Sequence, residues 1–196
     1  GLGDVYKRQF QIYDPKQRLR IDRQSRRNLE IDIRNTGATD HTLLSLMDTT
    51  VTSMGSRLLK KWLNDPIVDV IELDSRLDWL ESAIESNQSF PIRKELEPLS
   101  DLERICSRIE LGAATPRDLA RLRDDIPCFS RIKEVAGRIQ SSLSKNLLDS
   151  LDNFDQLYQR LEEALVEDPP PHLREGGVFA QGYDLTLDQL RALNSD

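Results

Sequence analysis

The sequence has few of the residues from which metal sites and disulfides are built. Its two cysteines, Cys106 and Cys128, and its two histidines, His41 and His172, have no partner at metal-ligand spacing. Two isolated cysteines favour a reducing compartment, so we expect a cytoplasmic protein. No apolar run approaches the roughly 20 residues that span a membrane, and the first residues do not resemble a secretory signal.

Motifs of nucleophilic and phosphate-binding sites are missing as well. No glycine is followed by lysine, so the phosphate-cradling P-loop is absent, and there is no G-x-S-x-G elbow. Carboxylates on amphipathic helices ordinarily form solvated faces, so we assign no catalytic pair. We therefore expect no catalytic, metal-binding or cofactor-binding residue in this chain, and no ATPase activity from it alone.

Charge is unevenly distributed along the sequence. The net charge of −7 argues against a strong nucleic-acid binder. Within residues 16–34, however, basic side chains outnumber acidic ones: Lys16, Arg18, Arg20, Arg23, Arg26, Arg27 and Arg34 against Asp22, Glu30 and Asp32. This cluster is either a phosphate-facing patch or a surface paired with acidic neighbours. Arg26 and Arg27 are our candidates for a DNA-phosphate contact or an interdomain salt bridge.

Apolar side chains recur at helical spacing in two segments, 53–63 and 70–86. In the first, Leu58 and Trp62 share one face, and Asn64-Asp65-Pro66 ends the helix. In the second, apolar residues at steps of three and four form a seam. We predict that five of these side chains form the structural core: Leu58, Trp62, Leu73, Leu77 and Leu80.

Helix start and stop signals divide the rest of the chain. Thr115 followed by Pro116 predicts a helix start, and Pro127 predicts its end. Further helices are expected at 24–31, 42–47, 101–111, 129–139, 143–151, 154–165 and 184–194, with one ending near Pro98 and a short strand at 178–180. The predicted fold class is all-α, an irregular multi-helix domain with at most a small β element near 176–183.

Five ordered sequence blocks resemble one family. They are Ile21-Asp-Arg-Gln-Ser-Arg-Arg-Asn-Leu-Glu-Ile31, Thr52-Ser-Met-Gly-Ser-Arg-Leu-Leu-Lys-Lys-Trp-Leu63, Asp101-Leu-Glu-Arg-Ile105, Thr115-Pro-Arg-Asp-Leu119 and Gly176-Gly-Val-Phe-Ala-Gln-Gly-Tyr183. Together they are similar to the core (lever) domain of the MutS family of DNA mismatch-repair proteins. On this basis residues 21–196 are a MutS-like core domain, incomplete at its C-terminus. Residues 10–20 are the end of a connector region or the beginning of the domain, and 1–9 a non-native leader.

The resemblance implies a role for the whole protein that exceeds this chain. Such proteins bind mismatched double-stranded DNA, use ATP and magnesium, form homodimers and work with a MutL-type partner in the bacterial cytoplasm, associated with the nucleoid. Their mismatch-reading Phe-x-Glu motif is absent here, as is the P-loop. The resemblance therefore implies a structural lever between DNA-binding and ATPase parts, and transfers no functional residue.

Two other interpretations stay open at this point. The chain is alternatively a stand-alone helical protein-interaction module. It is alternatively part of a MutS paralogue that acts on recombination intermediates. Neighbouring coding sequence that carries or lacks Phe-x-Glu and a P-loop separates these cases.

Overall fold

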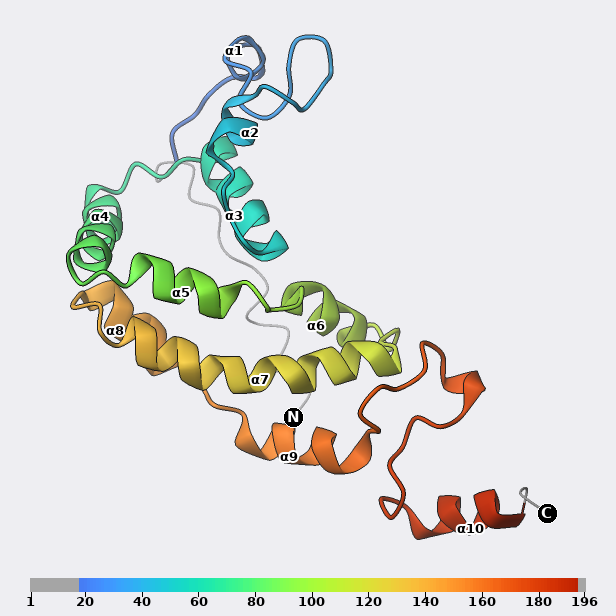
Figure 1. Ribbon diagram of the computed structural model, residues 1–196. Coiled ribbons are helices and arrows are strands. Elements are labelled where there is room, and N and C mark those ends of the chain that lie inside the picture. Colours follow the sequence, from blue (N-terminus) through green and yellow to red (C-terminus); the bar gives the residue numbers. More distant parts are fainter. Residues whose placement is uncertain (1–17, 194–196) are drawn as a thin grey trace, which may run out of the picture. The chain divides into compact units, whose positions relative to one another are not determined.

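The computed structural model describes residues 18–193, so the predicted leader 1–9 and most of the segment 10–20 lie outside the described residues. The described fold is all-α, as the sequence predicts (Figure 1). Its helices are α1 (Arg23–Asn28), α2 (Leu43–Met47), α3 (Ser53–Asn64), α4 (Val70–Glu85), α5 (Ser89–Leu96), α6 (Leu102–Glu110), α7 (Pro116–Ala136), α8 (Ser142–Ser150), α9 (Asp155–Ala164), the 3₁₀ helix η3 (Leu173–Glu175) and α10 (Leu185–Leu193). None of these described helices is long and apolar enough to cross a membrane.

The chain divides into two compact units. Of the described residues, the first unit contains 18–50 together with 55–77, and the second contains 51–54 and 78–193. The division falls inside α3 and inside α4. The domain limits inferred from the sequence concern the family resemblance and not these compact units, so they stay a prediction.

Side-chain caps start the helices where the sequence predicts. Thr115 Oγ1 accepts a hydrogen bond from the Asp118 backbone N–H, and Asp118 bonds back to the Thr115 N–H, which forms a capping box with Pro116 at the first helical position. Asp101 caps α6 through the Arg104 N–H at 3.3 Å. Gly112 follows α6 with a φ of +65°, a conformation that residues with side chains avoid.

The predicted end of this helix at Pro127 is wrong. α7 continues through Pro127 to Ala136, and the residues directly around the proline, Ile126, Cys128 and Phe129, are all buried. The proline ring itself lies on the exposed side. Proline in a helix interior costs about 3 kcal/mol, so we infer that the burial of its neighbours holds the helix together. The predicted helix at 129–139 is therefore the second half of α7.

α7 is the centre of the second unit. The helix pairs with the most extensive packing are α7 with α5, α6, α8 and α9, and Figure 1 shows α5 and α6 on one side of α7 with α9 on the other. Phe129 of α7 meets Phe154 edge to face, with ring centroids 5.9 Å apart. The apolar core of this unit is consequently built on one long helix.

Three charged residues of α7 are buried: Asp118, Arg123 and Asp125. Arg123 donates from Nη1 and Nη2 to the backbone carbonyls of Val166 and Glu167, at 3.1 and 2.9 Å. These bonds tie the loop after α9 to α7. The Asp125 carboxylate accepts from the Ser100 backbone N–H at 3.1 Å, and its burial raises the pKa of that carboxyl.

The described residues contain two isolated β-bridges, one between Arg18 and Ile67 and one in the tied loop. In the tied loop, a single antiparallel bridge joins Leu165 to Phe179, and the Ala180 N–H donates to the Ala164 carbonyl at 2.9 Å. The prediction of at most a small β element is confirmed, although the expected strand is reduced to this bridge. The chain segment that leads to this bridge contains Gly176, whose φ of +71° and ψ of −175° are accessible almost only to glycine.

The prediction that five particular side chains form the core is wrong. Leu58, Trp62, Leu73, Leu77 and Leu80 keep between 38% and 60% of their surface exposed, so none is buried in the described structure. Their spacing is helical, as predicted, but a stripe on a helix is buried only when another element packs onto it. The buried core instead lies around α7.

Trp62 nevertheless has a specific partner. The Arg76 guanidinium of α4 lies 4.0 Å from the centroid of the indole ring, which is cation–π geometry. Arg76 also bonds to Glu72 at 2.5 Å, one turn earlier on α4. The ring is thus part of a polar surface contact between α3 and α4 within the first unit.

Candidate functional site

The basic segment of the sequence forms one wall of a hollow in the first unit. Asp22 caps α1 through the Ser25 N–H, and the side-chain and backbone bonds from Ser25 lower the pKa of that carboxyl. α1 then presents its arginines toward the loop that follows it. The hollow measures about 390 Å³, and its lining residues are Arg23, Arg26, Arg27, Asp32, Ile33, Arg34, Gly37 and Asn64.

Arg26 connects α1 to the end of α3. Its Nη1 donates to Oδ1 of Asn64 at 3.3 Å, and Asn64 Nδ2 in turn donates to Oδ2 of Asp32, also at 3.3 Å. Arg26 is half-buried, and its Nε–H is hidden from solvent with no hydrogen-bond partner. This guanidinium is therefore held at the wall of the hollow with one donor unsatisfied.

Arg27 is exposed and closes the loop after α1. Its Nη2 donates to the backbone carbonyl of Asn35 at 3.2 Å, while the Asn35 N–H donates to Oε1 of Glu30 at 2.9 Å. Because the acceptor of Arg27 is a neutral carbonyl, its positive charge is not cancelled by this bond. The guanidinium remains available to an incoming anion.

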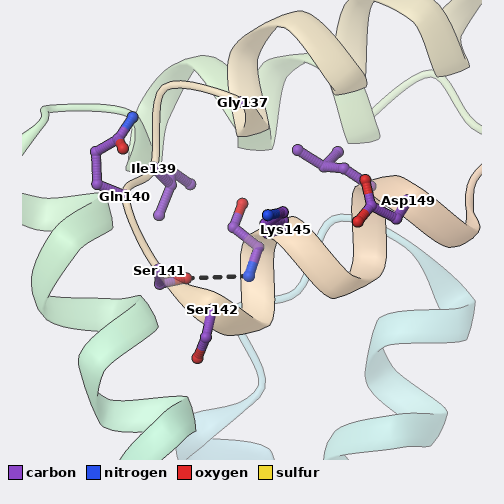
Figure 2. Close-up of a pocket in the computed structure, with 9 residues that line it drawn as sticks. Gly137, Ile139, Gln140, Ser141, Ser142, Lys145 and Asp149 are labelled. Carbon is purple, nitrogen blue, oxygen red and sulfur yellow. Dashed lines mark hydrogen bonds between the residues drawn. The ribbon is translucent and has the colours of Figure 1, made fainter.

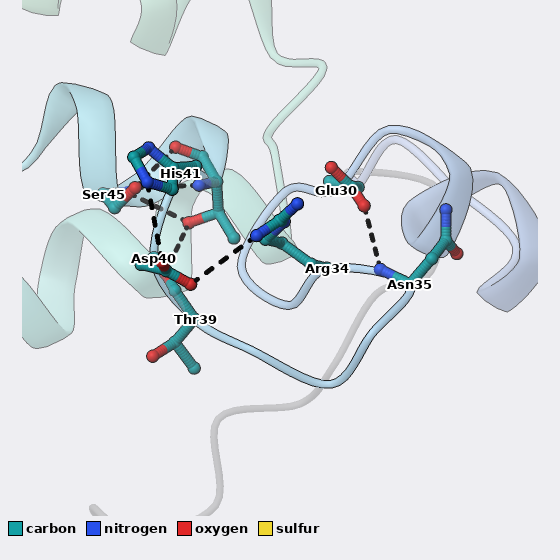
Figure 3. A network of polar contacts seen from close by, with 8 residues as sticks. Glu30, Arg34, Asn35, Thr39, Asp40, His41 and Ser45 are labelled. Atoms are coloured by element: carbon teal, nitrogen blue, oxygen red, sulfur yellow. Dashed lines mark hydrogen bonds and ion pairs between the residues drawn. The ribbon is translucent and has the colours of Figure 1, made fainter.

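A polar network supports the far side of the same loop. Figure 3 shows Arg34 and His41 on either side of Asp40, with Arg34 Nη1 at 3.9 Å and His41 Nε2 at 3.6 Å from the two carboxylate oxygens. Thr42 caps α2 in a capping box with Ser45. The loop carrying Arg34 is thus fixed at both ends, by Glu30 at its start and by the start of α2.

The hollow is positively charged on balance. Four guanidinium groups line it against one carboxylate, Asp32. Asp32 is already engaged, with Oδ2 3.3 Å from Lys60 Nζ and accepting from Asn64. An excess of cationic forks in a concave surface suits a carboxylate or phosphate ligand.

A second hollow, of about 490 Å³, lies at the turn between α7 and α8 (Figure 2). Two of its three serines make structural hydrogen bonds: Ser141 Oγ caps α8 by accepting from the Ser144 N–H at 3.0 Å, and Ser144 Oγ donates to the Ala136 carbonyl at 2.8 Å. Lys145 and Asp149 of α8 also line this hollow. Ser141 and Ser144 therefore hold the turn between α7 and α8 in place.

Metal coordination has no candidate in the part of the chain that the structure describes. Among residues 18–193, no group of three or more His, Cys, Asp or Glu side chains is gathered closely enough to hold an ion. Cys106 is exposed and Cys128 is buried, and both are free thiols. The basic hollow is the most developed candidate site of the described structure.

The structure brings both predicted residues, Arg26 and Arg27, to this hollow. Contact with DNA by either one stays a prediction. Sequence reasoning did not find Asn64, which joins the site from 38 residues away and has no local signal. Gly37 is also new, at a φ of +88° that lets the loop turn back beside the arginines.

A match to a known family identifies this helical chain as part of a DNA mismatch-repair protein. Residues 24–195 match the family described as MutS domain III. The match covers most of the 196 residues, and the chain therefore belongs to the MutS family. Proteins of this family generally have DNA as a binding partner.

Proposed function

We propose that this chain is the lever part of a mismatch-repair ATPase, joining a DNA-binding region to a nucleotide site that both lie in other parts of the whole protein. The observation that carries the proposal is the family match over residues 24–195 in a sequence without a P-loop or a Phe-x-Glu motif. The whole protein would bind mismatched double-stranded DNA and use ATP with magnesium. The chain itself would not be an enzyme.

The helical construction of the second unit supports this role. A long helix, α7, is packed against four others and tied to its neighbouring loops by buried charges, Asp118, Arg123 and Asp125. Such a unit moves as a body more readily than it deforms, because close-packed interiors transmit displacement. Movement of a packed helical unit is a means of connecting ATP state to the grip on DNA.

The test begins with the coding sequence on either side of this chain. We expect a Phe-x-Glu motif upstream and a P-loop downstream, and a protein expressed from that longer frame that binds a mismatched duplex more tightly than a matched one. ATP should change that affinity. The homodimer and a MutL-type partner would be examined on the same protein by light scattering and by pull-down.

Other outcomes would decide against the proposal in distinct ways. A longer frame without a P-loop would favour a stand-alone interaction module. A P-loop without Phe-x-Glu would favour a paralogue acting on recombination intermediates. ATP hydrolysis by the purified 196-residue chain, with magnesium present, would contradict the lever role itself.

A further inference from the structure

We propose that the basic hollow of the first unit is a docking site for a protein segment that carries carboxylates next to an apolar side chain. This goes beyond the proposed function and does not rest on it. The occupant is defined by the chemistry of the hollow, its charge and its apolar wall.

Charge complementarity is the first argument. Four arginines line the hollow, and although Arg34 is already paired with Asp40, Arg23 and Arg27 are exposed there beside Arg26. The lining carboxylate of Asp32 is shared between Lys60 and Asn64. Arginine forks bind carboxylates with two parallel hydrogen bonds, which a segment rich in Glu or Asp supplies.

The unsatisfied donor of Arg26 is the second argument. Its Nε–H is hidden and has no partner, and its Nη1 bond to Asn64 is long, at 3.3 Å. A buried donor without a partner costs roughly 1–3 kcal/mol. A bound carboxylate that drew the guanidinium toward the hollow would satisfy it, so occupancy by an anion improves the local structure.

Apolar exposure beside the arginines distinguishes a protein segment from a nucleic-acid backbone. Ile33 lines the hollow with 48% of its surface exposed, and Leu29, which directly follows α1, is 63% exposed. Arginine is enriched in protein–protein interfaces, and the buried centre of such an interface is more apolar than the rest of the surface. A phosphate backbone would leave the Ile33 side chain, which lines the hollow, uncovered.

The overall charge of the chain points the same way. With a net charge of −7, the molecule repels a polyanion at long range, and the positive field of the hollow is local. A short acidic segment approaches within that local field, whereas a duplex extends beyond it. Local attraction with long-range repulsion favours the smaller, less charged occupant.

The test uses the 196-residue chain and a short fluorescein-labelled peptide in which glutamates flank two leucines. Anisotropy should report binding that weakens about fivefold to tenfold in the Arg23→Gln/Arg27→Gln variant, the loss expected for two exposed ion pairs. The matched control is Lys145→Gln/Arg160→Gln, which removes the same charge from two exposed side chains of the second unit. It should leave the affinity unchanged.

Two further arms keep the proposal refutable. Ile33→Ser in the protein, or serine in place of both leucines in the peptide, should weaken binding even if the arginine variant fails to fold as judged by circular dichroism. Absence of peptide binding, or an equal loss in the control variant, would overturn the proposal. Labelled duplex DNA that displaces the peptide and loses affinity in the same arginine variant would assign the hollow to phosphates instead.

Discussion

Removal of the Arg123 guanidinium should open the loop between α9 and α10 while leaving most of the helices in place. Arg123 is 6% exposed and donates to the carbonyls of Val166 and Glu167. It also lies beside two carboxylates, Asp124 at 2.9 Å and Glu162 at 3.5 Å. Both acids are largely solvated, so the two backbone bonds carry most of the energy.

The magnitude follows from those two bonds. A hydrogen bond from a charged donor contributes about 1.5–3 kcal/mol. Water entering the space left by Arg123→Ala would recover part of this for the freed carbonyls. We therefore expect a loss of about 3 kcal/mol, localised in the loop, and about half of that for Arg123→Lys because one ammonium group cannot fork onto two carbonyls.

Native-state hydrogen exchange measures this loss at named amides. The Ala180 and Val166 N–H groups hold the β-bridge, bonded to Ala164 and Val178 at 2.9 and 3.1 Å. A loss of about 3 kcal/mol should accelerate their exchange by roughly two orders of magnitude, because each 1.4 kcal/mol is a factor of ten. The Ile105 amide of α6, bonded to Asp101, is the internal reference.

The control is Glu162→Gln, which removes an exposed partner at 3.5 Å and should change stability by less than about 0.5 kcal/mol. Unchanged exchange of both bridge amides in Arg123→Ala would refute the reasoning. Equal acceleration at Ile105 would also refute it, since the effect would then be global unfolding. Only a loop-specific change agrees with Arg123 as the tie between this loop and α7.

Three other substitutions test separate features, each read from urea unfolding followed by circular dichroism. Trp62→Ala should cost only about 1–2 kcal/mol, the sum of a surface cation–π contact with Arg76 and partial burial, and a loss above about 4 kcal/mol would restore Trp62 to the core. Pro127→Ala should stabilise by on the order of 1–3 kcal/mol, since alanine restores a helical N–H at an exposed position; destabilisation would mean that the ring is needed. Burial raises the pKa of Asp125 above its ordinary 3.8, so the folded state holds its proton to higher pH and this residue costs stability at neutral pH that is regained as pH falls through the folded-state pKa. Relative to Asp125→Asn, the wild type should therefore gain stability on acidification from neutral pH, and a relative loss would reverse our sign.

Local signals predicted the helix limits well because capping depends on near neighbours. Thr115 with Pro116, and Asp101 with Gly112, mark starts and ends within a few residues of the observed ones. The helix end predicted at Pro127 is wrong because the free-energy cost of a helical proline is local, whereas the burial of its neighbours comes from several other helices. Tertiary packing overrode the propensity of one residue.

Burial was beyond local pattern for a similar reason. The stripe containing Trp62 and Leu77 identifies a shared helix face, but not whether an element covers it. Buried charges show the opposite difficulty: residue type favours solvent exposure for arginine and aspartate, yet Arg123 and Asp125 are buried. Asp118 alone had a signal, the Thr-x-x-Asp spacing of its capping box with Thr115.

The candidate site was half visible in the sequence. A run of arginines predicts a basic surface wherever it folds, and Arg26 and Arg27 do share one hollow. The curvature of that surface depends on the loop through Gly37 and on Asn64, which the Arg26 hydrogen bond joins to α1. The positive charge of the site could therefore be predicted from the sequence, whereas its concave shape could not.

At Gly176 the steric space for a side chain and the backbone conformation make separate demands, which substitutions usually test together. A Cβ added there would meet no atom within 4 Å, yet its φ of +71° with ψ of −175° lies in a region that L-residues avoid. A side chain at this position would therefore have space, but an L-residue would be strained by the backbone angles. A D-alanine, for which these angles mirror ordinary extended backbone, should be accepted where L-alanine is strained. It should also stabilise the folded state, because it reduces the conformational entropy of the unfolded chain.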